Sequence, residues 1–455
     1  MSFWRWGAVL MSCCVVGCAS VRNYDAELDH TLGAATSGEL DRALTLLDSA
    51  HPKANKDVLY YFERGMLERL KSRYDESQKA WTAAQKVIES HERGAGEMLR
   101  SASSYVVSDK LRTYEPHDYE KVMLLTYMAL NHLALGELDD ARVAIKRTHE
   151  LEAEIAVERA RAVAEVEAEA KKRGAATKVK ELNGYPVEVI DNPAVNALKN
   201  GYQSALSHYL AGFVYESLGE GSLAAPGYRL AAELQPNQPL LEEGLRGLDQ
   251  RLSGPADGMT DVLFVVSSGA APALKAHPFR LPVVVNDRTM LISFSFPQLV
   301  PSPILDTPTG LTIGGAQPVA LTRITSIDLM ARRSLRDDMP AIMLRAGVRA
   351  TASAMLQYQL ERQVADKEAA HALAFATGLA SAILQGADDR TWRTLPGEVA
   401  IARLRVPPGV HDVTVHTPLG EQRAQVKVSG RYAVIDFRVL SRQLYVHAPS
   451  SKREN

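Results

Sequence analysis

The chain has 455 residues, of which 46% are hydrophobic and 23% are charged, and its formal net charge at pH 7 is -2. A chain of this length can bury the cores of two or three domains. The nearly balanced charge gives no broad electrostatic attraction to nucleic acid, so we expect no nucleic-acid partner.

The start of the chain has the pattern of a secretory signal. Arg5 supplies a positive charge, and the apolar run at 6–16 is too short to span about 30 Å of hydrocarbon as a stable helix. The run leads into Val-Val-Gly-Cys at 15–18, which resembles the lipobox of bacterial lipoproteins. The resemblance implies that residues 1–17 are removed and that Cys18 is acylated, and two or three acyl chains anchor a protein stably. The alternatives are a plain secretory signal that is cut after Ala19, or a buried thiol.

The residues around Cys18 also indicate a cellular location. In the lipoprotein sorting pattern an aspartate after the cysteine favours the inner membrane, and Ala19 in that position implies the outer membrane. The other two cysteines, Cys13 and Cys14, lie inside the expected signal, so the mature chain would have no disulfide in an oxidising compartment. We therefore expect an outer-membrane lipoprotein whose domains face the periplasm and are stabilised by their cores alone.

Residues 18–252 contain a repeated pattern of small and large side chains. The clearest copy runs from Ser204 to Pro236, and three earlier copies share its phase less strictly. The residues expected to pack the helices together are Gly65, Trp81, Ala84, Gly136, Ala141, Gly212, Tyr215, Gly219, Ala224, Tyr228, Ala231 and Pro236. This spacing resembles the tetratricopeptide repeat, which implies helix pairs stacked as a right-handed solenoid whose concave face receives a peptide or another protein. Because insertions interrupt the array, we expect that groove to be partly filled.

The longer insertion covers about 150–200. Residues 150–172 contain neither glycine nor proline, which predicts a long helix, and opposite charges one turn apart support a solvated helix. We expect this helix to lie against the repeats, and a protruding arm that meets a partner is the alternative. The turn residues at 183–186 then predict a short apolar strand at 187–190.

A mixed β/α domain is expected over 259–397, because the helical pattern stops at a Gly- and Pro-containing stretch just before it. Apolar residues at helical spacing predict helices at 326–336 and 341–364. Residues 369–386 are mostly small or apolar, and we expect a buried helix there rather than a membrane span. Runs rich in β-branched and aromatic residues predict strands at 261–266, 281–285, 290–296 and 319–324.

The end of the chain, 398–447, is expected to form a small antiparallel β-module. Turn residues separate four short alternating runs at 400–406, 410–416, 424–428 and 432–437. The stretch at 404–415 is similar to small β-domains found on many bacterial envelope proteins.

A charged, tryptophan-containing segment precedes this module. Asp388, Arg390, Trp392 and Arg393 combine charges with an indole that looks exposed, so we predict a partner contact there. The alternative is an indole that caps the domain core while the arginines pair locally. Together the lipobox, the repeats and the β-rich end resemble a family of repeat-containing proteobacterial lipoproteins. The resemblance implies an architecture and a cellular location, but no reaction.

Sequence motifs for catalysis or metal binding are absent. The sequence has no His-Glu-x-x-His zinc motif, no Gly-x-Ser-x-Gly elbow and no phosphate-binding loop. The pairs His411 with His416 and His30 with His51 are expected on different elements or faces. Ser267 and Ser268 follow a strand, and we interpret them as an ordinary strand end rather than as a nucleophile. We expect no catalytic site, no metal and no cofactor.

The expected fold is therefore a multidomain α+β protein, with an N-terminal α-solenoid of tetratricopeptide-like helix pairs, a mixed α/β domain and a terminal β-module. The expected function is that of a lipid-anchored envelope scaffold without enzymatic activity, which binds protein partners through its helical repeats and supports assembly of an outer-membrane or cell-surface machine. The alternative is an envelope hydrolase or a polysaccharide-binding or export factor with its site in residues 260–400.

Overall fold

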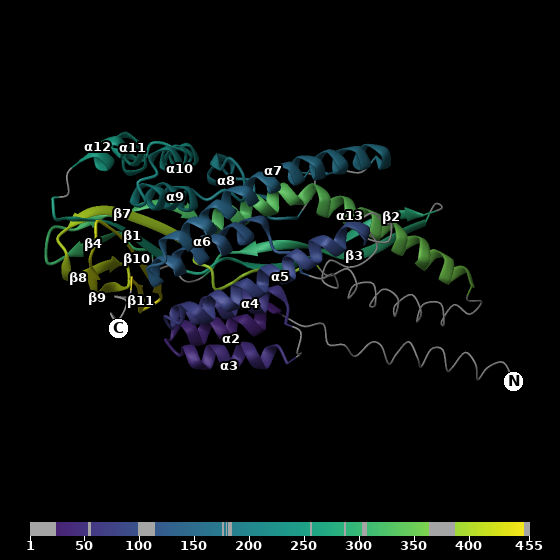
Figure 1. The fold of residues 1–455 in the computed structure, drawn as a ribbon. Helices are drawn as coiled ribbons and strands as arrows, with labels where there is room; N and C mark the ends of the chain where they lie inside the picture. The colour runs from purple at the N-terminus through teal and green to yellow at the C-terminus, as the bar shows by residue number, and fades with distance from the viewer. Residues whose placement is uncertain are drawn as a thin grey trace.

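The fold is described from a computed structural model (Figure 1). It is mixed α/β, with helices in the N-terminal half and β-sheets after them. The expected acylation site, Cys18, and the helix expected at 369–386 lie outside the described residues. The structure describes residues 24–52, 56–98, 114–174, 177–178, 180, 184–254, 257–285, 288–302, 307–363 and 387–449.

Each of the four repeat segments contains two consecutive helices joined by a short turn, which makes the two helices antiparallel neighbours. The pairs are α2 (Tyr24–Thr36) with α3 (Leu40–Ala50), α4 (Val58–Leu70) with α5 (Tyr74–Met98), α6 (Asp118–Leu135) with α7 (Leu138–Arg173), and α9 (Ala205–Ser217) with α10 (Gly221–Leu234). The short helices α8 (Pro193–Ala197), α11 (Pro239–Arg246) and α12 (Leu248–Ser253) complete this half.

Small residues let the two helices of a pair approach closely. A Cβ atom on Gly65 of α4 would overlap the indole of Trp81 on α5, and a Cβ atom on Gly212 of α9 would lie 2.6 Å from the ring of Tyr228 on α10. The alanines expected to pack the pairs, at 84, 141, 224 and 231, are all buried. Gly136 and Gly219 act differently, because both adopt a φ of 76° in the turn between two helices.

Other expected repeat positions differ in their surroundings. Tyr215 of α9 is buried, whereas Pro236 is exposed and lies two residues beyond the end of α10. Pro236 therefore follows the helix and does not pack the pair.

Helix α7 is the long helix predicted from the sequence. It packs on α6 in its first half, where Ile155 lies against Val122. From residue 160 to its end at Arg173 most of its side chains are exposed, and Gly174 ends it in a left-handed conformation. Of the predicted helix at 150–172, the expected contact with the repeats describes the part up to Arg159, which pairs with Asp118 of α6, and the alternative of a protruding arm describes the part after it.

The strand expected at 187–190 is wrong, because Val187–Val189 is a single 3-10 turn, η5. Its backbone hydrogen bonds are local, since Val189 N donates to Pro186 O and Ile190 N donates to Val187 O. An apolar run becomes a strand only where a neighbouring strand can accept its hydrogen bonds.

Two sheets pack face to face. The first has the order β11-β10-β1-β7-β6 and the second the order β5-β4-β8-β9. The first contains β1 (Thr260–Ser268), β6 (Thr322–Ser326), β7 (Glu398–Val406), β10 (Tyr432–Leu440) and β11 (Gln443–His447). The second contains β4 (Gly310–Ile313), β5 (Val319–Ala320), β8 (Gly409–Thr417) and β9 (Gly420–Val428).

Strand β1 is buried along its whole length because the first sheet is covered on both faces. Leu263 and Val265 point into the core shared with the helices, whereas Val262, Phe264 and Val266 point into the core between the two sheets. Strand β1 pairs in parallel with β10 and antiparallel with β7. The helices, the first sheet and the second sheet therefore form three successive layers.

The expectation of one antiparallel module at 398–447 is wrong in its pairing. The four predicted strands exist, but β7 and β10 flank β1, whereas β8 and β9 join β4. Their burial explains the division. Residues of β10 after Tyr432 are all buried, as befits a sheet covered on both faces, whereas β9 is mostly exposed or half-buried.

A long hairpin and a long helix extend away from the two sheets (Figure 1). Within the described residues, strands β2 (Ala273–Val285) and β3 (Arg288–Val300) form a sheet of their own. Ile292 packs against Ala350 and Ala354 of α13 (Ile327–Gln363). Both strands are longer than predicted. Prolines at 278, 282 and 297 obscure the pattern, but a two-stranded hairpin tolerates them because its outer edges need no donors.

Helix α13 is a single helix where two were expected. Pro340 lies inside it and removes one backbone hydrogen bond, which ordinarily costs about 3 kcal/mol. Packing before and after the proline offsets this cost, because Met339 and Met343 are both buried in the main core.

Candidate functional site

The segment predicted as a partner contact is enclosed by the protein's own helices. We call residues 387–397 the strap. Trp392 of the strap is fully buried, stacks on Phe62 of α4 with ring centroids 4.5 Å apart, and meets Trp81 of α5 edge-on at 6.0 Å. The expectation that this indole is exposed is wrong, and the alternative of an indole that caps the core describes its position.

Two buried carboxylates hold the backbone of the strap. Glu63 of α4 accepts hydrogen bonds from the N–H groups of Arg393 at 2.7 Å and Thr394 at 3.1 Å. Glu120 of α6 accepts one from the N–H of Trp392 at 2.7 Å. Burial raises the pKa of Glu63 to about 7, against the opposing effect of these donors. The helices thus bind a turn-containing stretch of their own chain through its main chain and one large ring.

The charged residues of the strap pair within the chain. Asp388 and Arg390 form an ion pair at 2.7 Å, and Arg393 pairs with Asp29 of α2 at 3.2 Å. Asp388 and Arg390 are half-buried, whereas Arg393 is buried. Local pairing of the arginines, the other half of the alternative, therefore also describes the structure.

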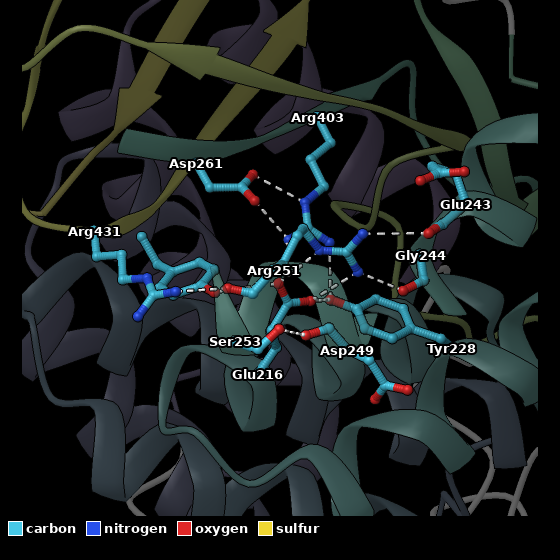
Figure 2. A network of polar contacts seen from close by, with 11 residues as sticks. Glu216, Tyr228, Glu243, Gly244, Asp249, Arg251, Ser253, Asp261, Arg403 and Arg431 are labelled. Carbon is cyan, nitrogen blue, oxygen red and sulfur yellow. Dashed lines mark hydrogen bonds and ion pairs between the residues drawn. The ribbon is translucent and has the colours of Figure 1, made fainter. Parts of the chain in front are cut away.

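A second polar cluster joins α9 and α10 to the first sheet (Figure 2). Glu216 of α9 accepts hydrogen bonds from Tyr228 at 2.6 Å, Arg403 of β7 at 2.7 Å and Arg251 of α12 at 2.8 Å. Arg403 also pairs with Asp261 of β1 at 2.7 Å. Burial alone would raise the pKa of Glu216, but the hydrogen bonds from the two arginines lower it below its usual value. Two arginines and two carboxylates balance each other here.

A third polar cluster joins α4, α5 and α6 to β10 and β11. Arg69 of α4 pairs with Asp436 of β10 at 2.6 Å and also donates to Asn131 of α6. His447 of β11 lies opposite Asp436 in the sheet and contacts the hydroxyl of Tyr74 at 3.1 Å. Burial, together with the neighbouring arginines, lowers the pKa of His447 well below its usual value. This imidazole is therefore neutral and structural.

Two groups contain residue types that bind metals. His149 and Glu152 of α7 meet His208 of α9, but the two imidazoles stack with centroids 4.9 Å apart instead of converging on a point, and His208 already pairs with Glu152 at 2.8 Å. Among the described residues, the ligand atoms of His132, Glu137 and Asp140 lie within 4.8 Å of one another at the surface. His132 is paired with Glu137 at 2.8 Å. We assign neither group as a metal site.

The serines at the end of β1 are buried. The Ser267 hydroxyl donates to Phe437 O at 3.3 Å inside the core, and Ser268 is the last residue of the strand. A substrate could not reach either hydroxyl, because both serines are buried.

His411 and His416, the first histidine pair considered from the sequence, both lie on strand β8. His411 bonds to Pro407 O at 2.7 Å, and His416 bonds to Thr312 of β4 at 2.7 Å. His416 lines a polar groove on the second sheet. The charged groups of this groove bond mainly to each other, as Arg423 does to Glu421 at 3.0 Å.

The remaining histidine pair belongs to the first pair of helices. His30 is exposed on α2, and His51 follows α3 and is buried between the rings of Tyr24 and Tyr60. The two residues therefore differ in element and in burial, as expected.

The buried charged residues that connect the helices to the strap and to the first sheet were not identified from the sequence. One signal in the sequence is a charged residue with apolar neighbours on both sides, as with Asp436 between Ile435 and Phe437. In the described ranges, no helix has the length and apolar content needed to cross a membrane. In comparisons with known proteins, the chain matches no family model, no curated protein and no solved structure.

Proposed function

We propose that this protein is a non-catalytic, lipid-anchored scaffold of the bacterial envelope, which binds protein partners through its helical repeats and supports assembly of an outer-membrane or cell-surface machine. The observation that supports the proposal most is where the perturbed titratable groups lie. In an active site such groups face a cleft that substrate can enter. Here Glu63, Asp436 and His447 are buried at joints that lock the helices onto the strap and the first sheet.

The partner surface is best sought on α7. The strap already occupies the side of α4 and α6 where a bound peptide would contact Glu63 and Glu120. Eight large apolar side chains are exposed in the described part of the chain, and half of them belong to this helix. They are Leu138 at 40%, Val143 at 55%, Val157 at 71% and Val163 at 52% exposure. Val157 and Val163 are about one and two-thirds turns apart, on either side of Arg159, and we take this part of α7 as the candidate surface for another protein.

The enzymatic or polysaccharide-handling alternative needs a reachable reactive group in residues 260–400. Within the described part of that range, the two serines considered from the sequence are buried at the end of β1. No specific observation favours this alternative over the scaffold.

Crosslinking in intact envelopes, followed by affinity capture, tests the proposal. We expect the wild type to capture a small set of envelope proteins, and Cys18→Ser to lose them because it is mislocalised. The double variant Val157→Asp/Val163→Asp should be localised correctly but lose the same proteins.

The matched control is Val410→Asp, which places a charge at a position of 65% exposure on β8, away from α7. It should capture the wild-type set. Capture of the same proteins by the α7 double variant would contradict the proposed surface, and capture of none by a correctly localised wild type would contradict the scaffold function.

A further inference from the structure

Helices α2, α4 and α6 begin at one end of the helical layer. The ring of Tyr24, the first residue of α2, meets His51 at 6.0 Å, and His51 lies 3.8 Å from Asp57, which caps the start of α4. The guanidinium of Arg390 lies over the ring of Tyr114, just before α6, and is within electrostatic reach of Asp57. These contacts place the three helix starts next to one another.

Helix α7 returns to this end and passes it. Because it is antiparallel to α6, its later residues reach the start of α6, where Arg159 pairs with Asp118 and, at 3.1 Å, with Asp338 of α13. From Arg159 to Arg173 the helix advances 14 residues, or about 21 Å at 1.5 Å per residue. We call residues 160–173 the α7 arm, and Figure 1 shows it extending in the same direction as α13 and the β2–β3 hairpin.

The end of the α7 arm and the chain that follows it are rich in basic residues. Residues 171–180 contain five basic residues and no acidic one. All five are exposed, and we call them the basic tip: Lys171, Lys172 and Arg173 in the last turn of α7, and Lys178 and Lys180 in the chain that follows it. Glu169 pairs with Arg173 and, at 3.9 Å, with Lys172, and Asp191 pairs with Lys180 at 3.5 Å. Glu181 also follows Lys180 directly in the sequence, so five basic residues face three acidic ones and the stretch keeps a small positive charge.

The proposed lipid anchor lies within reach of the same end. Cys18 is six residues before Tyr24, and a fully extended chain of that length spans at most about 21 Å. A bilayer that holds acyl chains on Cys18 is therefore no farther than this from the start of α2. The α7 arm extends about the same distance beyond the start of α6, so its tip meets that bilayer if the bilayer lies on the side toward which the arm extends.

We propose that the basic tip binds the anionic phospholipid headgroups of the leaflet in which acylated Cys18 is anchored. The inference rests on the proposed lipid anchor, and it gives the protein two membrane attachments and a defined orientation. A cluster of Lys and Arg next to a membrane anchor binds anionic lipid, with a gain of about fivefold in affinity per basic residue.

Vesicle binding by the mature chain tests this contact without the acyl groups. We use the chain without its first 17 residues and with Cys18→Ser, and vesicles of phosphatidylcholine alone or mixed 2:1 with phosphatidylglycerol. We expect binding to the mixed vesicles only, weakened by salt. Changing the five residues of the basic tip to Gln should weaken binding at least tenfold.

The matched control changes five exposed basic residues on other elements to Gln, which removes the same charge. They are Lys79, Arg229, Arg246, Arg423 and Lys427. Both variants should keep the circular dichroism spectrum and the urea midpoint of the parent. Equal binding by the tip variant and the parent, or equal loss in both variants, would overturn the inference.

The two proposals fail in different ways. If the wild type is acylated in cells but the Cys18→Ser chain binds no anionic vesicle, the anchor stands and the contact by the basic tip is wrong. If Cys18 carries no lipid and the Cys18→Ser chain still binds through the tip, the anchor is wrong and the contact stands.

Discussion

Truncation of Trp392 to alanine should destabilise the whole protein, because the strap connects the helical layer to β7. An indole buries up to about 250 Å², which at about 25 cal/mol per Å² is worth about 6 kcal/mol, of which an alanine retains part. Stacking on Phe62 and contact with Trp81 add to this, and the helices cannot close fully over the gap. Measured Trp-to-Ala changes in cores cost about 3–5 kcal/mol, and we expect about 4 kcal/mol here.

Urea unfolding, followed by both circular dichroism and tryptophan fluorescence, measures this change. Trp392→Phe keeps an aromatic ring against Phe62 and should lose less than half as much. Val410→Ala, at an exposed site on β8, should leave the midpoint unchanged. A loss below about 1 kcal/mol for Trp392→Ala would refute the idea that the strap is a structural part of the core.

Three further substitutions test the buried contacts that hold the helices to one another, to the strap and to the first sheet. Burial raises the pKa of Glu63 from 4.5 to about 7, so its contribution to stability is complete below pH 4.5 and is lost as the pH rises to 7. The free energy of unfolding, measured at several pH values, should therefore fall by up to about 3 kcal/mol over this range. Glu63→Gln should not show this fall. Arg403→Met leaves Asp261 without its arginine, and denaturation should report a loss of about 3–5 kcal/mol; an unchanged midpoint would show that the joint in Figure 2 contributes little. Gly65→Ala should cost about 1–3 kcal/mol through overlap with Trp81, whereas Gly33→Ala, with no atom near its Cβ, should be neutral or stabilising, and equal midpoints for the two would contradict the close packing of α4 on α5.

The elements that depend on local periodicity were predictable from the sequence. The long helix α7 follows from an uninterrupted run of helix-forming residues, and β1 follows from a run of β-branched residues that is buried on both faces. The two strands of the hairpin were predicted too short and α13 was predicted as two helices, and prolines lie in both elements. Both errors arise where tertiary packing overrides a local signal.

Pairing between distant segments could not be predicted from periodicity. The parallel pairing of β1 with β10 joins residues about 170 positions apart, and no local pattern records it. The position of Trp392 shows the same limit. Its charged neighbours suggested exposure, but Glu63 and Glu120, some 270 to 330 positions earlier, bind the strap and bury the indole.

The most direct measurement is the mass of the mature N-terminal peptide from protein extracted from cell membranes. The lipid anchor predicts a chain that begins at Cys18 and carries two or three acyl groups, and Cys18→Ser should abolish the modification and the membrane association that it provides. A chain that begins elsewhere, with an unmodified thiol or with no Cys18 at all, would contradict the lipid-anchored scaffold.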